Sequence, residues 1–423
     1  MRHRPSTMSL KNVVIVNDFA HVEGGASQVA LSSAIGLAGR NISVKLLTGV
    51  GPVDPELERH GVEVYCCDQY DILGDPNRAR AVLQGIWNSK AAHELKNILD
   101  WCDPASTVVH LHSWTKALSS SVVQMTLKKR YKLLCTLHDY FTVCPNGTLY
   151  RFHSKQTCDF RPLSGACLAN NCDRRRNYLH KLYRLVRHGI QCTLGRVPRG
   201  IEHFVFVSDF SKNILISYLP DQCQCFLVAN PIEVEYSKPV DVACNDACVV
   251  IGRFSEEKGI LPFLEKMQGR GLKVILVGDG ECRNDISRVY PFAEITGWVD
   301  RPGLNRYLDR ARVLVFPSLW YETQGLAVLE AAARGVPALV SDACAARDFV
   351  INQITGMHFK GGDFDDLALK LDLMKNDMFV RALGQSAYTH YWEHPCTRDR
   401  HTSELIAVYS AVLKGKASSY GGN

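Results

Sequence analysis

The sequence predicts two doubly wound α/β domains in tandem, each built on a parallel sheet with helices on both faces. Continuous apolar runs such as Val13–Val16 alternate with amphipathic stretches such as Ser27–Arg40, a pattern typical of buried parallel strands. A polar segment with a proline, Glu233–Asp246, interrupts this series, and a second series begins at Ala247. The 423 residues also suit two domains at roughly 150 residues each.

Strands are expected in both halves of the chain. In the first half, we expect strands at Val13–Asn17, Ile42–Thr48, Val62–Cys66, Thr107–Leu111, Leu133–His138 and His203–Ser208. In the second half, we expect them at Ala247–Gly252, Lys273–Gly278, Arg312–Phe316 and Pro337–Ser341. The predicted domains are 10–232, with an irregular insertion at about 140–200, and 245–385, followed by a helical segment at 386–423 that contains an amphipathic helix at Ser403–Leu413.

Composition is that of an ordinary globular protein. Hydrophobic residues make up 46% of the chain and the net charge is +6, too small an excess to indicate nucleic acid. No apolar run approaches the ~20 residues that span a bilayer, and Met1–Ser9 has no apolar core of a secretory signal. The sixteen cysteines are therefore expected to be reduced thiols in a cytoplasmic protein.

Two carboxylates, Glu322 and Glu330, flank a predicted strand-to-helix junction. The strand is Arg312–Phe316, and the helix begins near Gly325 and stops at Gly335 to Pro337. Free backbone N–H groups and the positive helix end at such a junction suit a phosphate. The two carboxylates could then hold hydroxyl groups at the two ends of one extended ligand.

Glycine-rich loops follow several predicted strands. Gly24-Gly25 follows the first strand, and Gly252 to Gly259 carries Arg253 and Lys258, which together could neutralise a diphosphate. Each loop alone is equally consistent with a plain or solvated turn. The others are Gly278-Asp279-Gly280 and Gly297-Trp298, both at strand carboxyl ends, where ligands of such folds bind.

In order and spacing, these motifs resemble the retaining, nucleotide-sugar-dependent glycosyltransferases of the GT-B fold, most closely glycosyltransferase family 4. The resemblance covers about residues 12 to 385 and is stronger in the C-terminal half. It implies two Rossmann-like domains that face a cleft, with the C-terminal helix returning to the N-terminal domain.

The resemblance also implies roles for single residues. Arg253 and Lys258 would neutralise the donor diphosphate, Glu330 would hold the ribose and Glu322 would face the donor sugar. His138, in Thr136-Leu137-His138-Asp139, would face the sugar from the other domain, unless it is a packed core histidine. The remaining donor contacts would come from Gly24, Gly25, Gly252, Gly278, Gly325, Leu326 and the backbone of Trp298. The usual Glu-Gly-Phe-Gly start is Glu322-Thr323-Gln324-Gly325 here, so its first glycine is missing.

The expected chemistry needs no metal. We find no convincing nucleophile for double displacement, and the resemblance implies reaction on the front face, with the leaving diphosphate accepting the acceptor's proton. Asp363-Phe364-Asp365 has the letters of a metal motif, but its place at the start of a helix favours a capping role. We therefore expect no cofactor for catalysis.

A cysteine cluster lies in the predicted insertion. Cys144, Cys158, Cys167 and Cys172 fall in an irregular stretch with the spacing Cys-x13-Cys-x8-Cys-x4-Cys. Four thiols can bind a structural zinc ion, which would fold a loop too polar to fold by its own core. The spacing has no Cys-x2-Cys knuckle, and free thiols or disulfides remain open alternatives.

The segment from Arg174 to Arg199 contains eight Lys/Arg residues and no acidic residue, with apolar residues interleaved. It predicts a basic amphipathic helix that either contacts anionic lipid headgroups or a lipid-diphosphate acceptor, or packs as a solvated helix on the N-terminal domain. The residues expected on the acceptor side are His112, Arg175, Arg184 and Arg187.

We therefore expect a retaining glycosyltransferase that moves a sugar from a nucleoside-diphosphate sugar, UDP more than GDP, to a glycan or lipid-linked glycan in surface polysaccharide or glycolipid biosynthesis. It would be cytoplasmic or peripheral at the inner face of the membrane. The alternatives are a non-catalytic sugar-nucleotide-binding scaffold and another GT-B enzyme, such as a sugar-nucleotide epimerase.

Overall fold

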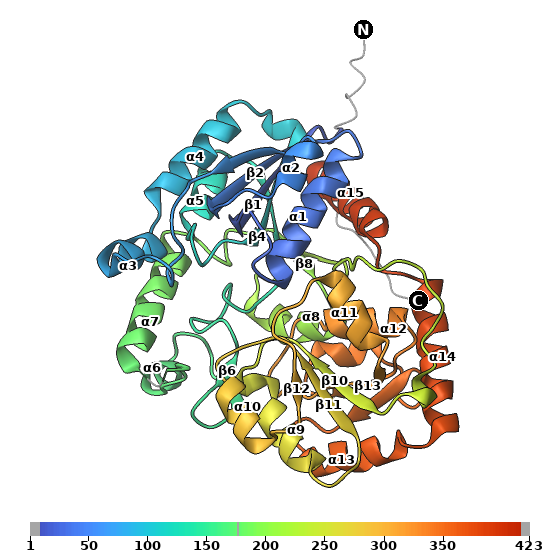
Figure 1. Ribbon diagram of the computed structural model, residues 1–423. Helices are drawn as coiled ribbons and strands as arrows, with labels where there is room; N and C mark the ends of the chain where they lie inside the picture. Colours follow the sequence, from blue (N-terminus) through green and yellow to red (C-terminus); the bar gives the residue numbers. More distant parts are fainter. Residues whose placement is uncertain (1–8, 176, 416–423) are drawn as a thin grey trace.

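Two parallel sheets organise the chain in the computed structural model, which describes residues 9–175 and 177–415. The N-terminal domain lies above the C-terminal domain, and helices cover both sheets (Figure 1). Residues 1–8, for which we expected no signal, and Arg176 of the basic segment lie outside the described residues. None of the helices in the described chain has the length and apolar character needed to cross a bilayer.

The N-terminal sheet has seven strands in the order β3-β2-β1-β4-β5-β8-β9, all parallel. Strand β1 lies inside the sheet between β2 and β4, so its apolar residues are buried on both faces. The strands are β1 (Asn12–Phe19), β2 (Ser43–Val50), β3 (Glu63–Cys66), β4 (Thr107–Ser113), β5 (Lys132–Thr136), β8 (His203–Phe206) and β9 (Gln224–Leu227).

Helices cover both faces of this sheet, and a long insertion between β5 and β8 adds the short antiparallel pair β6 and β7 together with α6 and α7. The helices are α1 (Gly25–Ala38), α2 (Pro55–Arg59), α3 (Arg78–Ile86), α4 (Ser89–Asp100), α5 (Ser121–Lys128), α6 (Gly165–Ala169), α7 (Tyr178–Thr193) and α8 (Asp209–Leu215), and the short strands are β6 (Tyr150–Arg151) and β7 (Gln156–Thr157).

The C-terminal sheet has six parallel strands in the order β12-β11-β10-β13-β14-β15. They are β10 (Ala247–Ile251), β11 (Lys273–Val277), β12 (Glu294–Ile295), β13 (Ala311–Phe316), β14 (Ala338–Ser341) and β15 (Gly356–Phe359). The helices are α9 (Ile260–Met267), α10 (Arg283–Val289), α11 (Arg301–Leu308), α12 (Leu326–Ala333), α13 (Phe364–Leu373), α14 (Asp377–Glu393) and α15 (Arg398–Lys414). Asp363 caps α13 by accepting the N–H of Asp366 at 3.0 Å, which confirms its capping role.

Helix α15 returns to the N-terminal domain, as expected. Its buried residues Leu405, Val408 and Val412 share one hydrophobic core with residues of β1, β2 and α1. The predicted boundary at residue 385 falls inside α14, so the chain crosses back only after that helix ends. Helix α14 thus packs on the C-terminal domain and α15 on the N-terminal domain, so the chain links the two domains a second time (Figure 1).

A buried polar contact anchors α15 to the sheet. The hydroxyl of Tyr409 and Nδ1 of His110 are 2.7 Å apart, while Nε2 of His110 lies 2.7 Å from the hydroxyl of Thr136. Tyr409 and His110 are fully buried, and burial lowers the pKa of His110, so the ring is neutral and needs both partners.

We predict that Tyr409→Phe lowers the free energy of unfolding by about 1–3 kcal/mol, because it leaves one ring nitrogen of His110 buried without a partner. Chemical denaturation measures the loss. Tyr70→Phe is the matched control, because Tyr70 is exposed and the phenyl ring keeps its contact with Arg80. An equal effect of the two substitutions would contradict the assigned role of Tyr409.

Candidate active site

The glycine loops of the C-terminal domain allow backbones to approach closely at the carboxyl ends of the strands. A Cβ atom on Gly278 would lie 2.0 Å from the carbonyl oxygen of Gly252, and one on Gly259 would lie 2.1 Å from that of Pro317. Gly278 and Gly259 also have positive φ angles of 135° and 68°. These positions need glycine, so the predicted loops have a structural basis.

Lys258 and Glu322 form an ion pair at the centre of this edge. Oε1 of Glu322 accepts a hydrogen bond from the ammonium of Lys258 and another, at 2.9 Å, from the hydroxyl of Ser318. The Glu322 side chain is only 11% exposed, so its charge depends on these two donors. The structure therefore brings together two of the predicted catalytic residues, which lie 64 positions apart in the chain.

A free cation and a free helix end lie beside this pair. The side chain of Arg253 is exposed, and no hydrogen bond or ion pair engages its guanidinium among the described residues. It lines a small cleft with Lys258 and Ser318. Gly325 precedes α12, and within the described chain no side chain caps its N-terminus, so backbone donors point to the same place.

Gly325 is also required by packing, because a Cβ atom there would lie 2.7 Å from Cβ of Ala346. On the opposite side of the cleft, Gly24 precedes α1, and the Cβ position of Gly25 lies 3.7 Å from Cδ1 of Leu326. The structure thus places Gly24 and Gly25 next to the N-terminus of α12, where the predicted donor residues meet.

Glu330 faces a cavity of about 540 Å³ between the two domains. The lining comes from α1 on one side and from Val299, Arg301 and Glu330 on the other. Burial raises the pKa of Glu330 to about 7, although Arg301, with Nη1 3.7 Å from Oε1, opposes the shift. The neighbouring Trp298 is 70% exposed, so its ring makes no core contact.

His138 enters the cleft from the N-terminal domain. Its Nε2 lies 3.0 Å from Nδ1 of His112, and its carbonyl oxygen accepts a hydrogen bond of 2.9 Å from the hydroxyl of Thr323 in the other domain. Burial lowers the pKa of His138 to about 3, so the ring is neutral near pH 7. His112 is buried in contact with His138 and therefore supports that ring from the core side.

Two further groups were not predicted. Asp18 is fully buried at the carboxyl end of β1, where it accepts four hydrogen bonds from the segment 113–118, at 2.8 to 3.1 Å. Burial raises the pKa of Asp139, next to His138, to about 6. Acidic residues at the ends of apolar strands were the available sequence signal for both.

The arginines expected on the acceptor side have mixed positions. Arg184 bonds to Asp173 and Asn146, and Arg187 donates to the carbonyl oxygen of Thr115 at 3.1 Å. These two hold the insertion on the domain and do not line an open surface, because their guanidinium groups already have local partners. Arg175 is exposed, and its place on the acceptor side stays a prediction.

The four cysteines of the insertion are free thiols, and Cys144, Cys167 and Cys172 are buried. Within the described residues, no three His, Cys, Asp or Glu side chains are arranged to hold a metal ion. Instead the ammonium of Lys181 lies 3.0 Å from Sγ of Cys172 and 3.6 Å from Sγ of Cys167. The arrangement does not form the expected zinc ligand set, and zinc binding itself stays a prediction.

Comparison with known proteins agrees with this geometry. Residues 245–377 match the family described as Glycosyl transferases group 1. The chain is 28% identical over 240 residues to the capsular polysaccharide biosynthesis glycosyltransferase CapM of Staphylococcus aureus. This aligned region covers 52% of this chain and 61% of CapM. The alignment thus spans less than two thirds of the relative.

Solved structures share the whole fold at low sequence identity. Sucrose-phosphate synthase from Thermosynechococcus elongatus has a TM-score of 0.69 and 16% identity, and covers 96% of this chain and 100% of that one. Anabaena HepE, solved in complex with UDP, has a TM-score of 0.64 and 14% identity, with coverage of 95% and 100%. The chain therefore has the GT-B fold, and its C-terminal domain is similar to the group 1 glycosyltransferases.

Proposed function

We propose that the protein is a retaining glycosyltransferase that moves a sugar from a nucleoside-diphosphate sugar to a glycan or lipid-linked glycan acceptor. The observation that carries the proposal is the cluster of Arg253, Lys258 and the N-terminus of α12 between two carboxylates, Glu322 and Glu330. Positive groups that flank a cleft, with hydroxyl-binding carboxylates on either side, match an extended donor with a diphosphate at its centre.

The donor would bind along the interdomain cleft. The nucleoside would fill the 540 Å³ cavity, with its ribose hydroxyls on Glu330. The diphosphate would lie at the N-terminus of α12, neutralised by Arg253 and Lys258. Its sugar would then reach Glu322 and His138, which face the cleft from opposite domains.

The residues position the donor and stabilise the charge that develops on the leaving group. The bond from the anomeric carbon to the diphosphate oxygen breaks, the acceptor oxygen bonds to that carbon on the same face, and the acceptor's proton passes to the leaving diphosphate. His138 is neutral near pH 7, so its role is to hydrogen-bond the sugar. Lys258 would transfer its contact from Glu322 to the phosphate as charge grows there.

UDP is the preferred nucleotide in this proposal, because the similar HepE structure is described as a complex with UDP. A surface polysaccharide acceptor is supported by CapM, whose description names capsular polysaccharide biosynthesis. A thermal-shift screen with UDP- and GDP-sugars tests the donor, because a ligand that binds only the folded state raises the melting temperature. The anomeric configuration of the product by NMR tests retention.

Arg253→Ala should lower kcat/KM for transfer roughly 100-fold or more, because one preorganised donor to the leaving diphosphate is lost. Arg288→Ala is the matched control, because Arg288 is exposed and, among the residues that the structure describes, its ion pair is with Asp285 on its own helix. Steady-state assays of sugar transfer measure both. Selective nucleotide-sugar binding without turnover in the wild type would favour the non-catalytic scaffold, and interconversion of donor sugars would favour an epimerase.

Glu330 should make donor binding depend on pH. Its pKa of about 7 means that the carboxylate that accepts ribose hydroxyls is lost as pH falls through 7, so donor affinity should weaken between about pH 8 and pH 6. Glu330→Gln should bind more weakly at pH 8 and lose most of this dependence. Isothermal titration with UDP at several pH values measures the affinity. An unchanged pH dependence in the variant would contradict the role of Glu330 as the ribose ligand.

The same shift has a consequence for stability. The folded state binds the Glu330 proton more tightly than the unfolded chain does, so stability from this group is present below about pH 4.5 and is lost as pH rises towards 7. Glu330→Gln should therefore raise the melting temperature relative to wild type more at pH 8 than at pH 5. The exposed Glu393→Gln is the control and should show no such difference.

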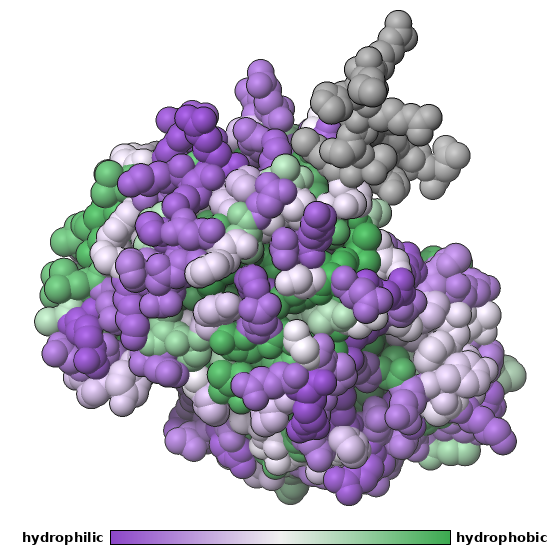
Figure 2. Space-filling model, turned by 90° about the horizontal axis from the view of Figure 1, so that it is seen from above, coloured by the Kyte–Doolittle hydropathy of each residue, from purple (hydrophilic) through white to green (hydrophobic). Residues whose placement is uncertain are grey.

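We also propose that the N-terminal domain docks on an anionic membrane through α3 and α7. Leu179, Leu182 and Val186 lie three to four positions apart on α7 and are 73%, 48% and 46% exposed, and Leu83 on α3 is 68% exposed. The two helices contact each other and lie at the left margin in Figure 1, the side on which Figure 2 shows a band of apolar side chains. The segment 174–199 contains no acidic residue that would repel anionic headgroups, and its Arg175, Arg196 and Arg199 side chains are exposed.

Replacement of Leu179, Leu182 and Val186 by Gln should reduce flotation with liposomes that contain phosphatidylglycerol roughly tenfold, because three apolar side chains no longer enter the interface. The control is Leu369→Gln with Leu373→Gln on α13, which are equally exposed in the other domain. Equal flotation of the two variants, or flotation of wild type that does not depend on anionic lipid at low salt, would remove this proposal.

A further inference from the structure

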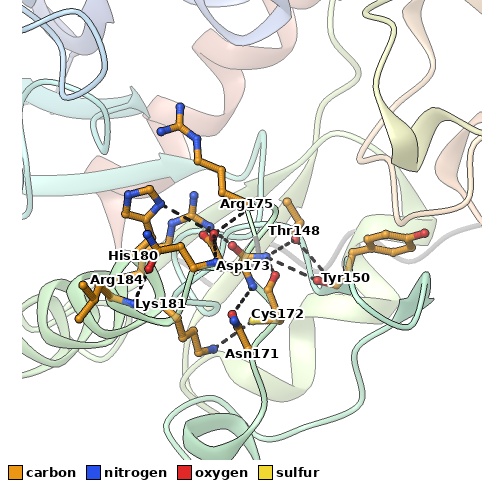
Figure 3. A network of polar contacts seen from close by, with 12 residues as sticks. Thr148, Tyr150, Asn171, Cys172, Asp173, Arg175, His180, Lys181 and Arg184 are labelled. Carbon is orange, nitrogen blue, oxygen red and sulfur yellow. Dashed lines mark hydrogen bonds and ion pairs between the residues drawn. The ribbon is translucent and has the colours of Figure 1, made fainter. Parts of the chain in front are cut away.

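Buried polar contacts fix the part of the insertion between β5 and β8 that lies next to α7. The carboxylate of Asp173 is 1% exposed and binds Nη1 of Arg184 at 3.2 Å and the N–H of Arg175 at 2.9 Å (Figure 3). The side-chain amide of Asn146 donates to the carbonyl oxygen of Cys172 at 2.9 Å. The segment around Cys172 is thus fixed against α7 from both sides.

Lys181 is the unusual member of this network. Its side chain is 1% exposed, and no carboxylate lies within ion-pair distance of its ammonium in the part of the chain that the structure describes. Its nearest polar groups are the thiols of Cys172, at 3.0 Å, and Cys167, at 3.6 Å. Figure 3 shows Lys181 reaching from α7 towards the segment Asn171–Asp173.

A buried ammonium needs a compensating negative charge, and here only sulfur can supply it. Burial opposes the charged form, but the hydrogen bond to Cys172 and the neighbouring thiols outweigh burial and raise the pKa of Lys181. Peroxides oxidise cysteine sulfur, and here the buried side chain of Lys181 places a nitrogen atom 3.0 Å from Sγ of Cys172.

We propose that Lys181 and Cys172 are a redox modification site at which hydrogen peroxide joins the side chains through a single oxygen atom, as a nitrogen–oxygen–sulfur bridge. The thiol S–H bond and one N–H bond of the amine break, and an S–O and an N–O bond form. Two molecules of peroxide accept the four electrons, and three molecules of water leave. The heavy atoms need little movement, because sulfur and nitrogen already lie 3.0 Å apart.

The bridge would act on the donor side of the cleft through the neighbouring residue Arg174. Its guanidinium pairs with Glu257, at 3.3 Å, and with Glu281, which lie in the loops after β10 and β11. Lys155 of the insertion similarly lies 3.2 Å from Glu256. A covalent link at Cys172 would hold the insertion, with Arg174 and Lys155, in its contacts with the C-terminal domain. This consequence does not depend on which sugar is transferred.

Mass spectrometry of the full chain tests the proposal. After treatment with dilute hydrogen peroxide, the intact mass should rise by one oxygen and fall by two hydrogens, and digestion should give a cross-linked pair of peptides that contains Cys172 and Lys181. Dithiothreitol should separate the pair and restore the original mass. The melting temperature should rise on oxidation and return on reduction.

The variants Cys172→Ala and Lys181→Met should each lose this cross-link, and Cys192→Ala, on the same helix but away from Lys181, should keep it. The wild-type measurement stands even if a variant fails to fold. Oxidation of Cys172 to sulfinic acid without a cross-link, a disulfide between Cys167 and Cys172, or about one zinc per purified chain that keeps these thiols unreactive would each overturn the proposal.

Discussion

The structure depends on one constraint: the short segment before α12 must contact both domains at once. Glu322 pairs with Lys258 in its own domain, and the next residue, Thr323, donates to the carbonyl oxygen of His138 in the other domain. The carbonyl oxygen of Thr323 in turn accepts a hydrogen bond of 2.7 Å from the hydroxyl of Ser208. Because these contacts fall between the two predicted donor carboxylates, they set the width of the cleft at the place where a sugar would sit. The threonine that replaces the usual glycine is therefore part of the closure between domains, and a glycine there could not make this side-chain bond.

The charges around the cleft are balanced internally, and a donor would change that balance. Glu322 is held by Lys258 and Ser318, and Glu330 lies 3.7 Å from Arg301 with its pKa raised to about 7 by burial. A bound diphosphate would replace Glu322 as the partner of Lys258, and ribose hydroxyls would donate hydrogen bonds to Glu330. Arg253 has no partner among the described residues, so it could bind a phosphate without first breaking an ion pair. The energetic cost of breaking internal pairs is then offset only by a ligand with both phosphate and hydroxyl groups.

Much of the fold was predictable because its strands are continuous apolar runs bounded by glycine loops. The strands β9 and β15 of the two large sheets and the short pair β6 and β7 were not predicted. They are only two to four residues long, and β9 and β15 lie at sheet edges, so they leave little periodic signal. The pairing of Lys258 with Glu322 was hidden because it joins residues 64 positions apart. The inward orientation of Arg184 and Arg187 was also hidden, since a basic amphipathic helix predicts its charges on the exposed face, whereas here Asp173 and Thr115 draw them in. Likewise, cysteine spacing could not reveal that a lysine on α7 would reach the thiols.

A structure of the protein with UDP bound tests the central claim most directly. We expect the diphosphate at the N-terminus of α12 within hydrogen-bond distance of Arg253, the ribose hydroxyls on the carboxylate of Glu330, and the ammonium of Lys258 moved from Glu322 to the phosphate. Glu322 would then be free to face the sugar. A nucleotide bound elsewhere, or one bound in the cleft with the pair between Lys258 and Glu322 intact and Glu330 out of contact, would contradict the account.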